Sequence, residues 1–167
     1  ADAAIGAAFI PVLTEYYLKD KKEEAWQISS YIFNIAFLGL TLIVVVGELF
    51  MPTLIRVTTP GFVPDPELFH HTVLLSRIIF PIILLLGMGG VVVGILHTHR
   101  RFGAAAVAPI FWNIVNLAAV FWLHRQWGIY SAAWGLLAAT LLQLGVQGSP
   151  FLFLKWPYVP RLNLSHP

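Results

Sequence analysis

TVLLSRIIFPIILLLGMGGVVVGIL, residues 72–96, holds a single charged side chain, Arg77. An α-helix rises 1.5 Å per residue, so about 20 apolar residues cross a hydrocarbon core about 30 Å thick. Lipid offers no partners to backbone N–H and C=O groups, so a segment that crosses it must form these hydrogen bonds internally. The stretch is therefore predicted to be a transmembrane helix.

Four more stretches resemble it in length and apolar character. The five predicted spans are residues 3–18, 28–47, 72–96, 102–123 and 129–154. They predict an all-α, polytopic membrane helix bundle of about five transmembrane helices within residues 1–154. Residues 155–167 hold three prolines and mix aromatic with basic side chains, which is typical of a membrane interface. We expect this tail to lie at the membrane surface.

The composition excludes a water-soluble domain. Hydrophobic residues make up 58% of the chain and charged residues 11%, with a mean hydropathy of +0.78. Soluble domains carry about 25% charged residues. The chain has no cysteine, which excludes disulfides and thiolate metal sites. No basic cluster is interleaved with aromatics, so no nucleic-acid partner is expected.

Lysine and arginine are unevenly shared between alternate loops. One side carries Lys19, Lys21, Lys22, Arg100, Arg101, Lys155 and Arg161, and the other carries Arg56, Arg77 and Arg125. Positively charged loops remain in the cytoplasm, so the first span is predicted to run inward and residues 155–167 to be cytoplasmic. An inward first span requires a helix upstream. The start at Ala1, with a short apolar stretch directly after Asp2, also leads us to expect a fragment of a longer protein or a processed one.

The segment 48–67 is expected on the outer side. Its density of proline and glycine predicts turns in place of helix. Four possible ligands for an external metal ion follow in or near it, namely Asp65, Glu67, His70 and His71. Adjacent histidines rarely reach one ion in good geometry, so no metal site is expected.

Arg77 is the most informative charge. If its helix begins near Phe69, the guanidinium lies about two turns, or roughly 12 Å, below the outer end. A charge at that depth faces a cavity, a partner or the interface. Two interpretations remain open: Arg77 extends to the outer head groups, or it contacts an anionic head group or a carboxylate on a neighbouring helix. Glu48, near the end of its span, is interpreted as interfacial.

Asp2 has two interpretations as well. Near the start of the first span it can complement the helix dipole. Alternatively it lines a cavity, where it would bind a cation or pair with an arginine.

Polar pairs and small residues mark possible helix contacts. Gln143 and Gln147 share one face of the last span, as do Asn113 and Asn116 on the span before it. Such amides are predicted to join helices, each contributing on the order of 1 kcal/mol, with solute contact as the alternative.

Four glycines in the third span include a G-x-x-x-G pattern, which predicts close packing: Gly87, Gly89, Gly90 and Gly94. Four prolines lie inside or at the ends of spans and can kink them: Pro11, Pro81, Pro109 and Pro150.

Motifs for catalysis are missing from the sequence. It contains no G-x-x-x-x-G-K-[ST], H-E-x-x-H or G-x-S-x-G, so we expect no catalytic residues, metal or cofactor, and no enzyme. Energy for transport would come from a gradient, the membrane potential or another part of the protein.

Several short motifs in a fixed order resemble one known family. Residues 8–16, AFIPVLTEY, are similar to a signature of the MurJ (MviN) family, the lipid II flippases of bacterial cell-wall synthesis. The further matches follow in the family's order: Thr59-Pro60-Gly61-Phe62, Arg77-Ile78-Ile79-Phe80-Pro81, Gly94-Ile95-Leu96 with Arg101-Phe102, Ala108-Pro109 with Asn113, Ala133-Trp134-Gly135, and Leu142-Gln143 with Gln147 and Pro150.

This resemblance implies a fourteen-helix fold of the multidrug/oligosaccharidyl-lipid/polysaccharide exporter superfamily. The chain would supply helices 2–6, within the N-terminal lobe. The family's pyrophosphate-holding arginines would precede Ala1, and the C-terminal lobe would lie outside the chain. Asp2 matches an acidic position of the cavity-lining second helix, and Arg77 matches a basic position, so both are expected to be linked to substrate or ion. Thr59, Pro60, Gly61 and Phe62 are expected to form an outer turn without a ligand.

The expected function is to flip lipid II across the bacterial inner membrane by alternating access. The expected partners are the lipid-linked glycan precursor, membrane lipids, a coupling ion or the membrane potential, and the missing parts of the same protein. Three alternatives remain open: a multidrug or polysaccharide exporter of the same superfamily, a membrane-embedded polyprenyl-phosphate transferase, and a scaffold that transports nothing.

Overall fold

The computed structural model describes residues 22–154, and these form helices joined by short connections. The elements are α2 (Lys22–Leu49), α3 (Met51–Thr58), the 3-10 helix η1 (Pro60–Phe62), α4 (Pro66–Ile79), α5 (Ile82–Thr98), α6 (Gly103–Trp127) and α7 (Tyr130–Leu154). The predicted all-α class is confirmed.

Four segments are long and apolar enough to cross a membrane. They are Trp26–Leu49, Pro66–Thr98, Gly103–Trp127 and Tyr130–Leu152. The predicted spans 28–47, 72–96, 102–123 and 129–154 are thus confirmed, with ends that differ by a few residues. The predicted first span, residues 3–18, and the tail, residues 155–167, lie outside the described residues.

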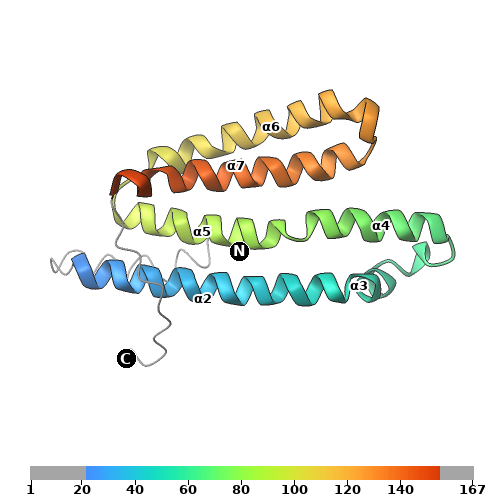
Figure 1. Cartoon of the computed structure of the whole chain (residues 1–167), viewed down its shortest axis with the longest axis horizontal. Coiled ribbons are helices and arrows are strands. Elements are labelled where there is room, and N and C mark those ends of the chain that lie inside the picture. Colours follow the sequence, from blue (N-terminus) through green and yellow to red (C-terminus); the bar gives the residue numbers. More distant parts are fainter. Residues whose placement is uncertain (1–21, 155–167) are drawn as a thin grey trace.

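The spans lie side by side and alternate in direction (Figure 1). Helix α5 contacts α2 and α7, while α6 packs along α7 and α4 contacts the same helix. The α5–α6 loop and the start of α2 lie at one end of the bundle, whereas α3, η1 and the α6–α7 turn lie at the other. This is the alternation of basic and less basic loops on which the predicted topology depends.

Helix α5 forms the centre of the described bundle. Its buried apolar side chains include Met88, Val91, Val92, Ile95 and Leu96. In α6, by contrast, Ala108 is the only buried residue of a helix that is described throughout. Large apolar side chains on its other faces are exposed, with Phe121 at 81%. In a bilayer this surface is covered by lipid or by another part of the protein.

The third span is interrupted at Phe80 and Pro81, between α4 and α5. Pro81 has no N–H to bond the carbonyl of Arg77, four residues earlier. Both residues keep right-handed helical angles, so α5 continues in nearly the direction of α4 (Figure 1). The kink predicted at Pro81 is therefore a local break, whereas Pro109 and Pro150 lie inside continuous helices.

The prediction of turns throughout residues 48–67 is wrong for residues 51–58, which form α3. Pro52 lies in the first turn, where a missing N–H removes no helical hydrogen bond. The Thr58 and Thr59 hydroxyls donate to the Leu54 and Ile55 carbonyls, at 2.8 Å each, and so stabilise its end. Beyond it, the predicted turn at Thr59, Pro60, Gly61 and Phe62 is a turn of 3-10 helix.

Two of the four glycines predicted to pack closely in α5, Gly87 and Gly89, lie directly against neighbouring helices. A Cβ on Gly87 would lie 2.5 Å from Leu40 Cδ1 of α2, and a Cβ on Gly89 would lie 2.9 Å from Gln147 Oε1 of α7. A Cβ on Gly94 would meet nothing within 4 Å among the described residues. The small residues Gly87 and Gly89 therefore allow close approach of two different neighbours, and Gly94 is buried as well.

Candidate functional site

An ion pair joins α2 to α4 near the end of the bundle that holds α3 and the α6–α7 turn, which the predicted topology places outside. Arg77 Nε lies 3.9 Å from Glu48 Oε2, with the two side chains 45% and 28% exposed. At this distance the contact is electrostatic and too long for a hydrogen bond. Arg77 therefore contacts a carboxylate on a neighbouring helix, one of the alternatives that the sequence left open. The sequence interpretation placed its partner, Glu48, at the interface.

The pair leaves polar atoms unsatisfied. Glu48 Oε1 is buried and accepts no hydrogen bond in the described part of the chain, and neither does Thr41 Oγ1, two helical turns earlier on the same face of α2. Buried polar atoms without partners are rare and call for an explanation. Both oxygens can accept a hydrogen bond from a water molecule, which is the usual way in which buried polar atoms of this kind are satisfied.

The residues next to the ion pair form a close steric contact. Gly47 precedes Glu48, and a Cβ built on it would overlap the aromatic ring of Phe80. Phe80 lies at the α4–α5 break, three residues after Arg77. Charge and shape therefore hold the C-terminal end of α2 against the same short segment of the third span.

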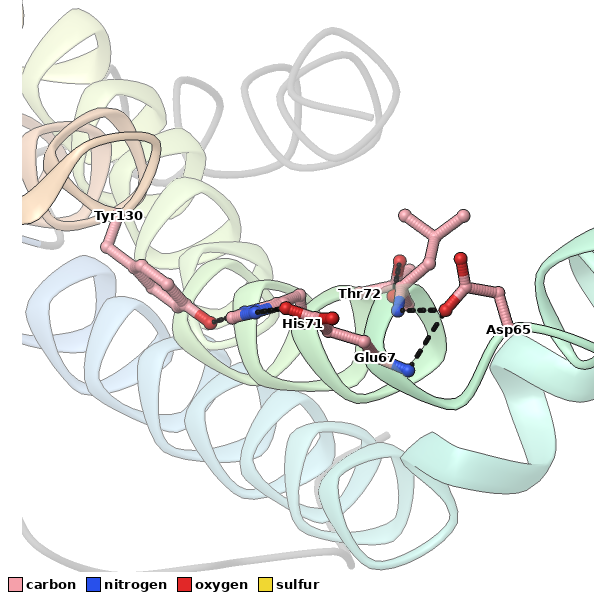
Figure 2. A network of polar contacts seen from close by, with 6 residues as sticks. Asp65, Glu67, His71, Thr72 and Tyr130 are labelled. Atoms are coloured by element: carbon pink, nitrogen blue, oxygen red, sulfur yellow. Dashed lines mark hydrogen bonds and ion pairs between the residues drawn. The ribbon is translucent and has the colours of Figure 1, made fainter.

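A second polar network joins the starts of α4 and α7 (Figure 2). Asp65 caps α4 by accepting hydrogen bonds from the Glu67 and Leu68 amides at 3.1 and 3.0 Å. His71 Nδ1 lies 2.6 Å from the Tyr130 hydroxyl, and His71 Nε2 lies 3.9 Å from Glu67. Within residues 22–154, no group of three or more potential ligands is placed to hold a metal ion. The contact between His71 and Tyr130 thus links the start of α4 to the start of α7.

The predicted amides occupy different environments. Gln147 is buried at the α5–α7 contact, beside Gly89, and Gln143 is half-buried one turn before it. Asn113 is exposed, and its Nδ2 donates to the Pro109 carbonyl of its own helix at 2.9 Å. Asn116 contacts α7, since a Cβ on Gly135 would lie 3.3 Å from its Oδ1.

The polar link between α6 and α7 was not predicted from the sequence. Trp112 Nε1 donates to the buried Thr140 hydroxyl at 3.1 Å, and this hydroxyl donates to the Leu136 carbonyl at 2.7 Å. An indole N–H within an apolar segment requires an acceptor. This requirement could have predicted from the sequence that Trp112 has a hydrogen-bond acceptor, although it does not identify Thr140 as that acceptor.

Asp2, the other residue expected to be linked to substrate or ion, lies outside the described residues. Among the predicted site residues that are described, the structure pairs Arg77 with Glu48, a residue that was not predicted to belong to the site. The sequence missed Glu48 as a partner and missed the contact between Gly47 and Phe80.

His99 lies at the opposite end of the bundle, just outside the third span. Its ring stacks on Trp26, with centroids 4.0 Å apart and planes inclined by 17°. Burial disfavours the charged imidazolium and lowers the pKa of His99 from its ordinary value of 6.5. Burial therefore favours the neutral form of the ring.

We expect His99 to make stability depend on pH. Because its pKa is lower in the folded state, the unfolded chain binds a proton first as the pH falls. The contribution is fully present above about pH 6.5 and is lost as the pH falls through the folded pKa. NMR of ¹³C-labelled histidine in the detergent-solubilised protein should show a midpoint below 6.5 that is absent from His99→Gln. A midpoint at or above 6.5 would contradict the effect of burial.

Comparison with known proteins places these features in a family. The family model described as "Lipid II flippase MurJ" matches residues 1–166. A probable lipid II flippase MurJ of Rhizobium tropici is 36% identical over 155 residues, which covers 87% of this chain and 28% of the relative. Its counterpart in Rhizobium meliloti is 32% identical, with 87% and 28% covered. The lipid II flippase MurJ of Burkholderia cenocepacia is 26% identical, with 88% and 29% covered. The chain thus spans less than a third of the length of these relatives, and it belongs to the lipid II flippase MurJ family.

Proposed function

We propose that the protein flips lipid II across the bacterial inner membrane and that this chain supplies helices 2–6 of its N-terminal lobe. The observation that carries the proposal is the family match over residues 1–166, on a chain whose described part has four segments able to cross a membrane. The remaining helices, including the first and the C-terminal lobe, would belong to the same protein.

The proposed mechanism is alternating access without covalent chemistry. The polar head group would cross through a hydrated cavity between the lobes while the lipid tail stays in the bilayer. The α4–α5 break supports this proposal because a helix interrupted at a proline can bend there. The membrane potential or an ion gradient would bias the cycle, with Asp2 and Arg77 as residues linked to substrate or ion.

The Glu48–Arg77 pair has a place in this mechanism. It lies on the outer side of the break, whereas the contact of Gly87 with Leu40 lies on the inner side. Opening the ion pair would free α4 from α2 while α5 stays packed. We propose that the outer half of the third span moves in this way during the cycle.

The proposal is tested in a bacterial strain depleted of its own lipid II flippase. The full-length protein should restore growth, and lipid II should become accessible to a lipid-cleaving enzyme added outside the cells. Asp2→Ala should insert normally but restore neither growth nor accessibility. Asp20→Ala, which removes an acid from a lysine- and glutamate-rich loop, serves as the control and should behave as wild type. Failure of the wild-type protein to rescue would overturn the proposed function, and normal growth with Asp2→Ala would overturn the role of Asp2.

A further inference from the structure

A cavity of about 410 Å³ lies between the α5–α6 loop and α7, at the end of the bundle that the topology places in the cytoplasm. Residues 100–104 line one side, and Ser149 and Pro150 of α7 line the other. The cavity is separate from the Glu48–Arg77 pair, which lies near the other end of the bundle.

The cavity carries two unneutralised positive charges. Arg100 and Arg101 are both exposed, and within the described residues neither forms an ion pair. Their backbone is held in place at the end of α5. The Arg101 and Arg100 amides donate to the Leu96 and His97 carbonyls at 2.9 and 3.0 Å, and Arg100 adopts a φ of 56°. This is a Schellman arrangement, in which glycine is the usual residue at the left-handed position.

The start of α6 adds backbone donors to the same cavity. Gly103 and Ala104 line it, and the first amides of a helix have no partners within the helix. Phe102, at the N-cap position, supplies no side-chain cap. Two guanidinium groups with free helical amides favour an oxyanion, phosphate above all.

The position of the cavity indicates that the phosphate belongs to a lipid head group. One candidate span ends at Thr98 and the next begins at Gly103, so the loop lies at the boundary between hydrocarbon and head groups. Phe102, which lines the cavity, is 55% exposed and offers a surface for an acyl chain. The Ser149 hydroxyl donates to the Val146 carbonyl, so its lone pairs remain available to a hydroxyl donor of the head group.

We propose that this cavity binds an anionic phospholipid of the cytoplasmic leaflet, with its phosphate between Arg100, Arg101 and the start of α6. Basic pockets between helices on the cytoplasmic side are suited to such head groups. A glycerol head group fits best, because its hydroxyls can donate to Ser149. The bound lipid holds the ends of α5, α6 and α7 together at the inner surface.

Native mass spectrometry of the detergent-solubilised full-length protein, titrated with dioleoylphosphatidylglycerol, tests the proposal. Each guanidinium near an anionic surface contributes on the order of a fivefold change in affinity. Arg100→Gln and Arg101→Gln should each weaken binding of the first lipid about fivefold, and the double variant about 25-fold. Arg125→Gln, which removes one guanidinium near the other end of α6, should bind as wild type. Dioleoylphosphatidylcholine should bind more weakly and equally to all variants.

A second variant covers the case in which the double variant fails to fold. Ala104→Glu places a carboxylate in the first turn of α6, where it suits the helix dipole but repels a phosphate. It should keep the helical circular dichroism and lose the preference for phosphatidylglycerol. Unchanged lipid affinity in the folded arginine variants or in Ala104→Glu would overturn the proposal. Inorganic phosphate at roughly 10 mM, in excess over the lipid, is the competitor. If it displaces the lipid, the cavity binds free phosphate, and this result would also overturn the proposal.

Discussion

Arg77→Glu, made in the full-length protein, is expected to abolish growth of the flippase-depleted strain, and Glu48→Arg in the same gene is expected to restore it. The single change sets two carboxylates against each other where a guanidinium and a carboxylate lie 3.9 Å apart. At this separation and an effective dielectric constant of about 20, the Coulomb energy is about 4 kcal/mol, and its sign is reversed. Arg77 is nearly half exposed, so screening reduces this figure wherever water reaches the pair. The exchanged pair restores the attraction with the positions reversed.

Growth after depletion and the amount of inserted protein on a membrane blot are the measurements. Arg125→Glu is a charge reversal at the same end of the bundle, at an exposed residue with no ion pair among the described residues, and should grow normally. If the exchanged variant inserts but does not support growth, Arg77 acts on a substrate or ion directly and its role is more than pairing with Glu48. If Arg77→Glu grows normally, the pair does not hold α4 in the working protein.

Gly47→Ala is expected to destabilise the protein by about 1–3 kcal/mol, the usual cost of overfilling a packed contact. The new methyl group would overlap the ring of Phe80, a residue of the short connection between α4 and α5. Relief requires either rotation of the half-buried ring or movement of α4 away from α2, and the second would also lengthen the Glu48–Arg77 contact. Both effects oppose the packed arrangement of the outer half of the third span.

The same helix supplies a matched control. A Cβ on Gly39 meets nothing within 4 Å, so Gly39→Ala should retain stability or raise it through the higher helix propensity of alanine. Thermal unfolding in detergent, followed by circular dichroism, measures both variants. Adding Phe80→Ala to Gly47→Ala should recover part of the loss because it removes the overlapping ring. Equal melting temperatures for Gly47→Ala and Gly39→Ala would show that the ring moves aside without cost.

The spans themselves were predictable because hydrocarbon makes one simple demand on sequence. Each spanning segment needs about 20 apolar residues and satisfies its own backbone, so a local property determines a local structure. The stretch around Arg77 has this length and apolar character, so it could be predicted without any other part of the chain. Residues 51–58 did not show it, because their eight residues lie among prolines that usually end helices. Helix α3 forms there because Pro52 falls in the first turn and two threonines stabilise the end.

Only one residue of the Glu48–Arg77 pair could be recognised as a site residue from the sequence. Arg77 stood out as a charge within an apolar segment, and any such charge requires a counterpart. Glu48 did not stand out, because it lies at the end of its span, where a carboxylate can face water. The glycines of α5 show the same difference. Gly87 and Gly89 could be recognised as small residues, but their neighbours, Leu40 and Gln147, come from other helices and could not be predicted.

The sequence by itself identified the segments that are long and apolar enough to cross a membrane and the family to which the chain belongs, and it predicts the side on which most of the basic loops lie. These conclusions depend on composition and on short motifs in a fixed order, and both can be recognised without knowing any tertiary contact. Only the tertiary structure decided that Glu48 faces Arg77, that Gly47 receives the ring of Phe80 and that two loop arginines border a cavity with α7. The physical reason is that such pairings depend on how helices distant in sequence rotate and slide against each other, and apolarity along one helix does not specify either motion.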